Sequence, residues 1–312
     1  MVRVDTSSDT THIPGFQQPT STRDITSGVG SWRPGGVALP LVIAIAAATT
    51  LYASVVAGIA RQWFEDPDTA YGILLVGASL FVFHRHVRGL RRLAAVPSDS
   101  GFLVVGAALL IYIVGTFTGD VFLLRISFPA VLVGSIVALW GIAHARTLLP
   151  ALALLALAIP LPVVIVTRLT LPLQLVASQI AAGVLSLAQV PVLRDGNLLT
   201  LPNITLEVAQ ACNGLRSVVS LVAVAAICGA VIPLSIRRTI LLVAAAIPIA
   251  VVGNGLRVAA TGLMTLSMGD RAVRGTVHEL TGFVAFVVMC IVTLLFLRTT
   301  QRMEFRWARL HA

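Results

Sequence analysis

"VALPLVIAIAAATTLYASVVAGIA", residues 37–60, is an apolar run of 24 residues that contains no charged side chain. A run of this length can cross the hydrocarbon core of a bilayer as a single helix. It is too long for the apolar core of a signal peptide, and no short basic leader stands before it. We therefore expect the run to be retained as a membrane helix.

The composition of the whole chain points the same way. Of the 312 residues, 57% are hydrophobic and only 11% are charged, which is typical of an integral membrane protein. We predict an all-α fold, a polytopic bundle of transmembrane helices in the lipid bilayer, over residues 37–297. Residues 1–36 are rich in Ser, Thr, Asp, Gly and Pro and predict a disordered cytoplasmic tail. Residues 298–312 are predicted to form a basic cytoplasmic tail.

Eight further apolar runs follow the first one. They cover residues 69–84, 101–118, 121–143, 148–167, 171–190, 213–233, 239–266 and 279–297. The connections between the runs alternate in charge. Basic segments are expected in the cytoplasm, and these are 84–92, 144–146, 235–238 and the C-terminal tail, whereas the acidic or neutral segments 65–68 and 118–120 should face outward. With both termini inside, this alternation predicts about eight crossings, so one of the nine runs does not cross.

The run predicted not to cross is residues 171–190. It carries a stripe of polar side chains, namely Gln174, Ser178, Gln179, Ser186 and Gln189. It also follows a stretch interrupted by prolines, "IPLPVVIVTRLTLP". Such a segment can lie in the outer interface or re-enter the membrane as a hairpin.

The positive charge of the chain has a simple explanation in this topology. The net charge is +9, and every basic residue is an arginine. These arginines stand in short connections and in the C-terminal tail, where they set the orientation in the membrane. Because no basic patch is interleaved with aromatic residues, we exclude nucleic acid as a partner.

Polar residues gather at the predicted outer ends of the last three runs. Cys212 stands at the start of one run with Arg216 one turn further on, so the helix N-terminus and the guanidinium both favour the reactive thiolate. Asn254 and Arg257 are three residues apart and share one face of the next helix. His278 stands at the start of the last run. We expect these side chains to meet on one side of the membrane.

The segment before Cys212 is expected to lie outside the membrane as well. Residues 190–211 contain the alternating pattern "NLLTLPNITLEV" after an Asp-Gly-Asn turn, which predicts a short β-hairpin over the membrane surface. The other two cysteines, Cys228 and Cys290, stand in the middle of apolar runs, and we expect them to serve as core packing.

A cysteine, a histidine and an arginine together suit acyl transfer. The thiolate attacks a carbonyl carbon, the histidine acts as general base and then as general acid, and the cation stabilises the oxyanion. Glu207 or Glu279 could orient the imidazole. Asn213 could cap the helix that follows it and donate a hydrogen bond.

The sequence resembles the exosortase and archaeosortase family of membrane transpeptidases over residues 37–297. The resemblance rests on "ACNGLRS", "NGLR" and "HELTG" in this order, preceded by "LLPALALLALAIPLP". It implies that Cys212 is the nucleophile, that Arg257 stabilises the oxyanion and that His278 is the acid/base. It also implies substrates that are secreted proteins with C-terminal sorting tails, made of a short motif, a spanning helix and an arginine cluster, and transfer to an acceptor in the envelope.

Two features depart from the family pattern. The residue after Cys212 is Asn213, where the family usually has Ser or Thr. An early "YSHG"-like stretch appears as "AYGIL", residues 70–74, which carries no histidine and makes Tyr71 and Gly72 poor candidates for chemistry.

Two other function classes remain open at this point. One is a transporter or channel whose path is lined by Arg216, Asn254 and Arg257 near broken helices, and the other is a membrane scaffold. We predict no cofactor and no metal, since the sequence contains no nucleotide-binding fingerprint and no paired metal ligands.

Overall fold

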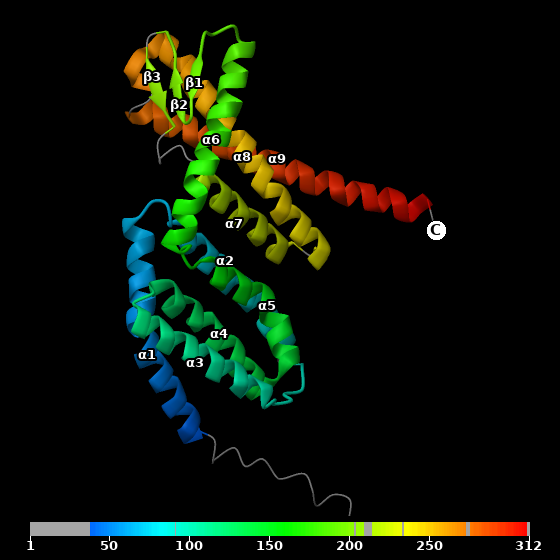
Figure 1. Ribbon diagram of the computed structural model, residues 1–312. Helices are drawn as coiled ribbons and strands as arrows, with labels where there is room; N and C mark the ends of the chain where they lie inside the picture. Colours follow the sequence, from blue (N-terminus) through cyan, green and yellow to red (C-terminus); the bar gives the residue numbers. More distant parts are fainter. Residues whose placement is uncertain are drawn as a thin grey trace, which may run out of the picture. The chain divides into compact units, whose positions relative to one another are not determined.

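The computed structural model describes residues 38–90, 92–202, 204–208, 214–232, 234–272 and 275–310. Within these ranges the chain forms nine α-helices and three short strands (Figure 1). The helices are α1 (Ala38–Glu65), α2 (Tyr71–Leu90), α3 (Ser100–Thr118), α4 (Val121–Trp140), α5 (Ile142–Leu157), α6 (Val163–Leu187), α7 (Leu215–Val231), α8 (Ile236–Met268) and α9 (Gly275–Leu310). The strands are β1 (Leu193–Asp195), β2 (Leu198–Thr200) and β3 (Thr205–Glu207), and a 3-10 turn, η2 (Gly269–Ala272), follows α8.

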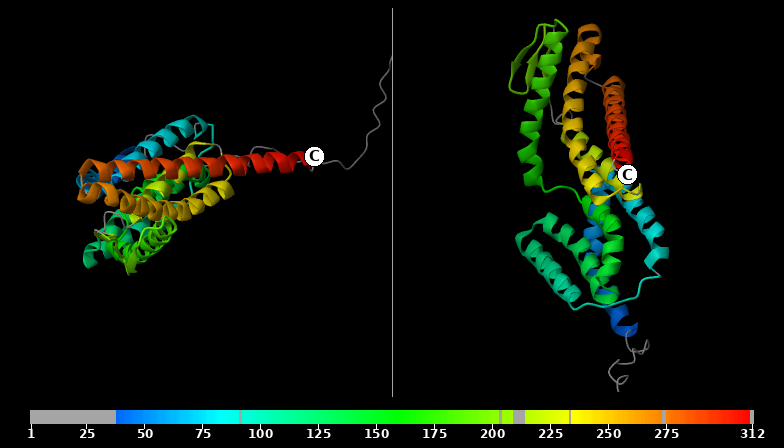
Figure 2. Two further views of the ribbon diagram at one scale, coloured as in Figure 1. Left: turned by 90° about the horizontal axis from the view of Figure 1, so that it is seen from above. Right: turned by 90° about the vertical axis from the view of Figure 1, so that its right-hand side faces the viewer.

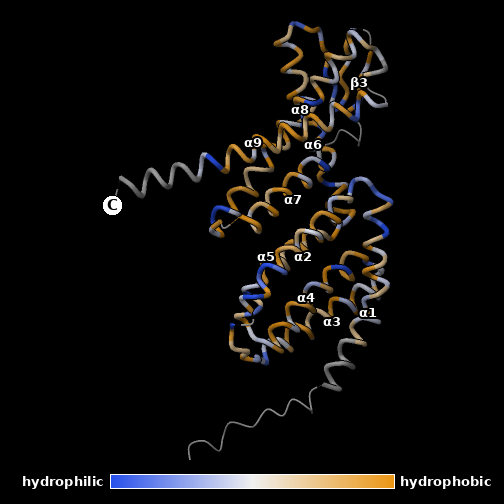
Figure 3. Tube along the Cα trace, turned by 180° about the vertical axis from the view of Figure 1, so that it is seen from behind, coloured by the Kyte–Doolittle hydropathy of each residue, from blue (hydrophilic) through white to orange (hydrophobic). Residues whose placement is uncertain are grey.

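Each of the nine described helices overlaps an apolar run, although run 148–167 crosses the break at 158–162 and reaches into α6. Six of these helices, α2, α3, α4, α6, α8 and α9, are long and apolar enough to cross a membrane. Helices α5 and α7 are shorter apolar helices. Large apolar side chains such as Phe102, Leu103 and Phe117 are exposed along α3, and hydrophobic colour follows α3, α4 and α9 in Figure 3. The protein is therefore a polytopic helical membrane protein.

The chain divides into two compact units, residues 1–51 and residues 52–312. In the first unit the described residues form the first half of α1, where Thr50 Oγ1 donates a hydrogen bond of 2.9 Å to the Ala46 carbonyl. The second unit holds the rest of α1 and all other elements.

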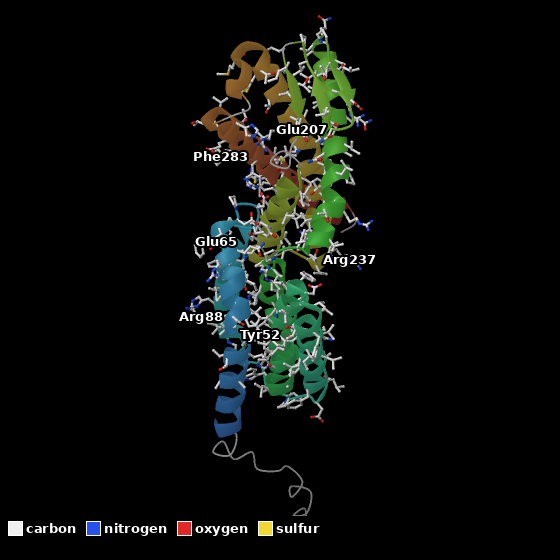
Figure 4. The ribbon with its side chains drawn as sticks, turned by 60° about the vertical axis from the view of Figure 1, so that its left-hand side comes forward. Tyr52, Glu65, Arg88, Glu207, Arg237 and Phe283 are labelled. Atoms are coloured by element: carbon white, nitrogen blue, oxygen red, sulfur yellow. The ribbon has the colours of Figure 1, made fainter. Side chains whose placement is uncertain are left out.

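Helices α3 and α4 form a closely packed hairpin. A Cβ on Gly101 would lie 2.1 Å from the Ala138 backbone nitrogen, and a Cβ on Gly134 would lie 2.8 Å from the Val105 backbone nitrogen. Small residues of this kind let two membrane helices approach to backbone contact. Tyr52 in the second half of α1, which is labelled in Figure 4, packs edge-on against Tyr112 of α3.

The turn between α3 and α4 is the "TGD" segment that the sequence marks as a connection. Gly119 takes the left-handed conformation with φ 68° and ends α3. Asp120 then caps α4, since its carboxylate accepts hydrogen bonds from the Phe122 and Leu123 backbone nitrogens at 2.8 and 3.2 Å.

Helices α2, α5 and α7 share an apolar core that includes Leu75, Leu154 and Ala223. Ser79 Oγ of α2 donates to the Ala151 carbonyl of α5 at 2.8 Å. Arg85, near the end of α2, donates to the Val231 carbonyl at the end of α7 at 2.8 Å. Helices α2 and α7 therefore run in the same direction, and their C-terminal ends lie together.

Two of the predicted basic segments lie near this shared end. Residues 84–90 form the last turns of α2, and segment 235–238 stands at the start of α8. In the described connection 92–99, Val96 N donates to the Trp140 carbonyl at the α4–α5 junction at 3.2 Å. One detail of the prediction is wrong. Residues 144–146 are not a loop, because the chain turns at Gly141 with φ 90° and α5 begins at Ile142, so that His144 is buried.

The predicted break near residue 170 is also wrong, because α6 is continuous from Val163 to Leu187 with Pro172 inside it. The chain breaks earlier, at residues 158–162, where Pro162 stands immediately before the helix. Membrane helices tolerate proline when neighbouring groups satisfy the backbone. Helix α6 as a whole has the length and composition of a membrane span.

Two residues of the predicted polar stripe, Gln174 and Ser178, are buried, whereas Gln179, Ser186 and Gln189 are exposed. Ser178 Oγ donates to the Gly196 carbonyl at 2.8 Å and accepts from Arg194 Nε at 3.0 Å. Gln174 is buried on the same side of the helix. Ser178 thus serves an internal contact, which local sequence patterns do not reveal.

The predicted β-hairpin is present, and a third strand extends it. The order is β1-β2-β3 with antiparallel pairing, in which Leu193 faces Thr200 and Leu198 faces Glu207. Leu185 of α6, Leu199 of β2 and Val258 of α8 share an apolar core. Figures 1 and 2 show the strands against α6, with α8 alongside.

Candidate active site

Arg257 of α8 and His278 of α9 lie in direct contact. Arg257 Nη2 and His278 Nε2 are 3.2 Å apart. A guanidinium has only hydrogen-bond donors, so Nε2 must be the acceptor. The imidazole in this pair is therefore neutral and carries its proton on Nδ1.

Gly282 makes room for this pair. It stands one helical turn after His278 on α9, and a Cβ at this position would lie 3.0 Å from Arg257 Nη2 and 3.1 Å from Arg257 Cζ. The guanidinium thus rests against the backbone of α9. Our sequence analysis assigned no role to Gly282, although its spacing of four residues from His278 puts both on one helix face.

Asn254 connects the same part of α8 to the start of α7. Its side chain is 1% exposed. Gly214, which precedes α7 with φ 79°, would bring a Cβ within 3.0 Å of Asn254 Nδ2. A single helical turn of α8 therefore contacts the start of α7 through Asn254 and the start of α9 through Arg257.

Cys212 and Asn213 lie outside the described residues, and the described chain resumes at Gly214. The structure therefore brings together the predicted Arg257 and His278, with Asn254 beside them.

Arg216 has a partner that the sequence analysis did not assign. Its guanidinium forms an ion pair with Asp68, in the connection between α1 and α2, and both side chains are more than half exposed. The expected support of Arg216 for a thiolate is reduced by this carboxylate. Beside the pair is a cavity of about 210 Å³. Its walls include Gln62, Asp66, Tyr71, Pro160 and Leu215.

The two predicted carboxylates occupy different places. Glu279 is exposed on α9, directly after His278. Glu207 is exposed on the edge strand β3, and its side chain makes no hydrogen bond or ion pair with any described residue.

Gly72, in the stretch that departs from the family pattern, has a packing role. A Cβ on Gly72 would lie 2.1 Å from Trp63 Nε1, and this nitrogen donates to the Ala158 carbonyl at 3.0 Å. Cys228 and Cys290 pack against the apolar core between α7, α8 and α9, as predicted. In the part of the chain that the structure describes, no group of three or more His, Cys, Asp or Glu could hold a metal ion.

Comparison with known proteins identifies the family. Residues 63–295 match the family model "Transmembrane exosortase (Exosortase_EpsH)". No curated protein and no solved structure matches the chain. The match includes α2 to α8 and the pair formed by Arg257 and His278. Because it covers well over half of the sequence, the chain belongs to the transmembrane exosortase family, and this membership implies a membrane sorting enzyme that processes C-terminal sorting signals.

Proposed function

We propose that this exosortase is a cysteine transpeptidase. It cleaves the C-terminal sorting tails of secreted proteins through a thioester and transfers the new C-terminus to an acceptor in the envelope. The observation that carries the proposal is the 3.2 Å hydrogen bond between Arg257 and His278, which pairs a potential proton acceptor with an oxyanion donor.

Cys212 is the nucleophile in this proposal. It stands two positions before Gly214, which contacts Asn254. Two residues of extended chain span about 7 Å at most. Covalent connectivity therefore keeps the thiol near the turn of α8 that carries Asn254 and Arg257.

The hydrogen bond between Arg257 and His278 couples proton transfer to oxyanion stabilisation. The lone pair of His278 Nε2 takes the proton of the Cys212 thiol, and the imidazole becomes a cation. It can then no longer accept a hydrogen bond from Arg257. The released Nη2 donates to the carbonyl oxygen, which gains negative charge as the Cys212 sulfur bonds to the carbonyl carbon.

A second donor of Arg257 supports the same role. Among the described residues, no hydrogen-bond partner reaches the buried Nε of Arg257. Buried donors are usually satisfied, so an acceptor on the substrate would complete the arrangement. Two donors in a fixed plane suit an oxyanion better than the single point charge of a lysine.

The tetrahedral intermediate then collapses to a thioester. The carbon–nitrogen bond breaks, and the departing amine takes the proton from His278. The acceptor nucleophile next attacks the thioester carbon and gives its proton to His278. His278 returns this proton to the sulfur as the carbon–sulfur bond breaks, so the enzyme is regenerated.

The active site faces outward in this proposal, with both termini in the cytoplasm. The contact between Arg85 and Val231 holds one basic end of the bundle together, and cytoplasmic segments are enriched in arginine. Arg257 stands 20 residues after Arg237 on α8. That is about 30 Å of helix, close to the thickness of the hydrocarbon core.

The enzyme is favoured over a transporter or channel. A path lined by cations would keep their charge available to a solute, whereas the charge of Arg216 is paired with that of Asp68. Membership of a family of sorting enzymes supports the same choice.

The test uses a co-expressed secreted protein that carries a sorting tail from the same genome. Cys212→Ala should abolish tail removal, measured as a mass shift of the substrate, because this variant lacks the thiol that attacks the scissile carbonyl in the proposal. Cys228→Ala and Cys290→Ala are matched controls that remove a thiol from the core, and both should retain activity. Continued cleavage by Cys212→Ala would overturn the proposal.

A further inference from the structure

An apolar groove runs between α8 and α9 from the candidate active site. Arg257 lines one end of it, and the volume is about 360 Å³. Its α8 wall also contains Gly253, Leu256 and Ala260, and its α9 wall contains Leu280, Thr281, Val284, Ala285, Val288 and Met289.

The groove is directed along the membrane helices. On α9 its wall extends from Leu280 to Met289, which is about 14 Å of helix. This is roughly half of the hydrocarbon thickness. The groove starts two residues after His278 on α9, so its polar end coincides with the pair of Arg257 and His278.

The walls combine exposed apolar side chains with small residues. Leu256, Val284 and Val288 are each about half exposed. Gly253, Ala260 and Ala285 have little or no side chain, and Met289 is buried at the floor, so close to Gly253 that a Cβ there would lie 2.5 Å from its Sδ. Small residues between larger apolar ones are the usual surface for helix packing in membranes.

We propose that this groove binds the transmembrane helix of the sorting tail. The inference rests on the proposed function, which requires the scissile peptide to lie at Arg257 and His278. A tail that continues into the membrane from that peptide would enter the groove at its polar end. Among the described residues of the walls, Arg257 is the one that carries a charge, and it stands where the tail changes from polar to apolar.

The groove also determines the register of the substrate. When the helix of the tail is packed between α8 and α9, its side-chain ridges lie in the grooves of these two helices. The tail can slide along them only if these contacts are broken and formed again one ridge further on. The packing contacts along the helix therefore hold one peptide bond of the substrate at the reacting groups.

Cysteine cross-linking in a variant that cannot cleave tests this proposal. The background carries Cys212→Ala, Cys228→Ala and Cys290→Ala, and a co-expressed reporter ends in a sorting tail with one cysteine in its apolar helix. Val284→Cys and Val288→Cys line the groove. Val287→Cys is the matched control, since Val287 is exposed on the same helix but does not line the groove.

We expect disulfide formation with the reporter at positions 284 and 288 to exceed that at 287 at least about tenfold, a difference of about 1.4 kcal/mol in occupancy. Equal cross-linking at all three positions would overturn the groove assignment. A second result would also overturn it: a thiol-reactive phospholipid labels the cysteines at 284 and 288 to the same extent with and without the reporter. A lipid would then occupy the groove. Failure of the proposed function is distinguishable, since it appears as tail removal that persists in Cys212→Ala.

Discussion

At the scale of single residues, the side chain on which the proposed reaction depends most is Arg257. It contacts His278 through one nitrogen, leaves Nε without a partner among the described residues, and lies against Gly282. Arg257→Lys keeps the charge but replaces a planar fork with a point charge. We expect it to lower the rate of tail removal about 100-fold or more, the usual effect of losing one oxyanion donor. The measurement is the initial rate of the substrate mass shift at matched enzyme abundance.

The control for this change is Arg237→Lys on the same helix. Arg237, labelled in Figure 4, is exposed at the start of α8. In the proposed topology its role is electrostatic, which lysine preserves. This variant should cleave at the normal rate. Equal activity of Arg257→Lys and Arg237→Lys would show that Arg257 acts through its charge alone and would contradict the proposed donation to the oxyanion.

At the scale of elements, close packing of α3 against α4 depends on one face of α3. Gly101→Ala should separate the two helices, because its Cβ would lie 2.1 Å from the Ala138 backbone nitrogen, which cannot move aside alone. Overpacking of this kind costs about 1–3 kcal/mol or more. We expect a lower thermal midpoint in detergent and a reduced yield from membranes.

Gly106→Ala is the matched change on the same helix, since nothing lies within 4 Å of the Cβ that it would add. It should be neutral or stabilise the protein by up to about 1 kcal/mol, because alanine loses less backbone entropy than glycine in a helix. If both alanines shift the thermal midpoint alike, close contact of α3 and α4 does not limit the stability of the protein.

At the scale of the whole molecule, the proposed orientation places the two ends of each crossing helix on opposite sides. Helix α3 offers a direct test, because Asp99 precedes it, Thr118 ends it, and both are exposed. In a background with all three native cysteines replaced by alanine, Thr118→Cys should react with an impermeant thiol reagent in intact cells. Asp99→Cys should react only after the membrane is permeabilised.

Each outcome of this labelling decides the orientation. The reverse pattern would place the pair of Arg257 and His278 on the cytoplasmic side and would contradict processing of secreted proteins at the outer surface. Reaction of both cysteines in intact cells would show that α3 does not cross the membrane.

Much of the fold is readable from local sequence. The nine apolar runs, eight of them predicted to cross the membrane and one to re-enter it or lie at its surface, all overlap helices. The Asp-Gly-Asn turn predicted the hairpin of β1 and β2. Run length and turn chemistry are properties of neighbouring residues. Two boundaries were misjudged because the prediction used only neighbouring residues. Pro172 was interpreted as a break although it lies inside α6, and residues 144–146 were interpreted as a loop although they lie within α5.

By itself, the sequence determined the membrane class, the positions of the helices and the residue types that could carry acyl transfer. Only the tertiary structure decided which of these side chains lie in contact. His278 Nε2 lies 3.2 Å from Arg257, 21 residues earlier, and Asp68 pairs with Arg216, 148 residues later. The contact of Gly282 with Arg257 and the groove between α8 and α9 likewise depend on how the helices pack. The physical reason is that helix formation depends on local hydrophobicity and length, whereas contacts between helices depend on how each helix is rotated and packed against its neighbours.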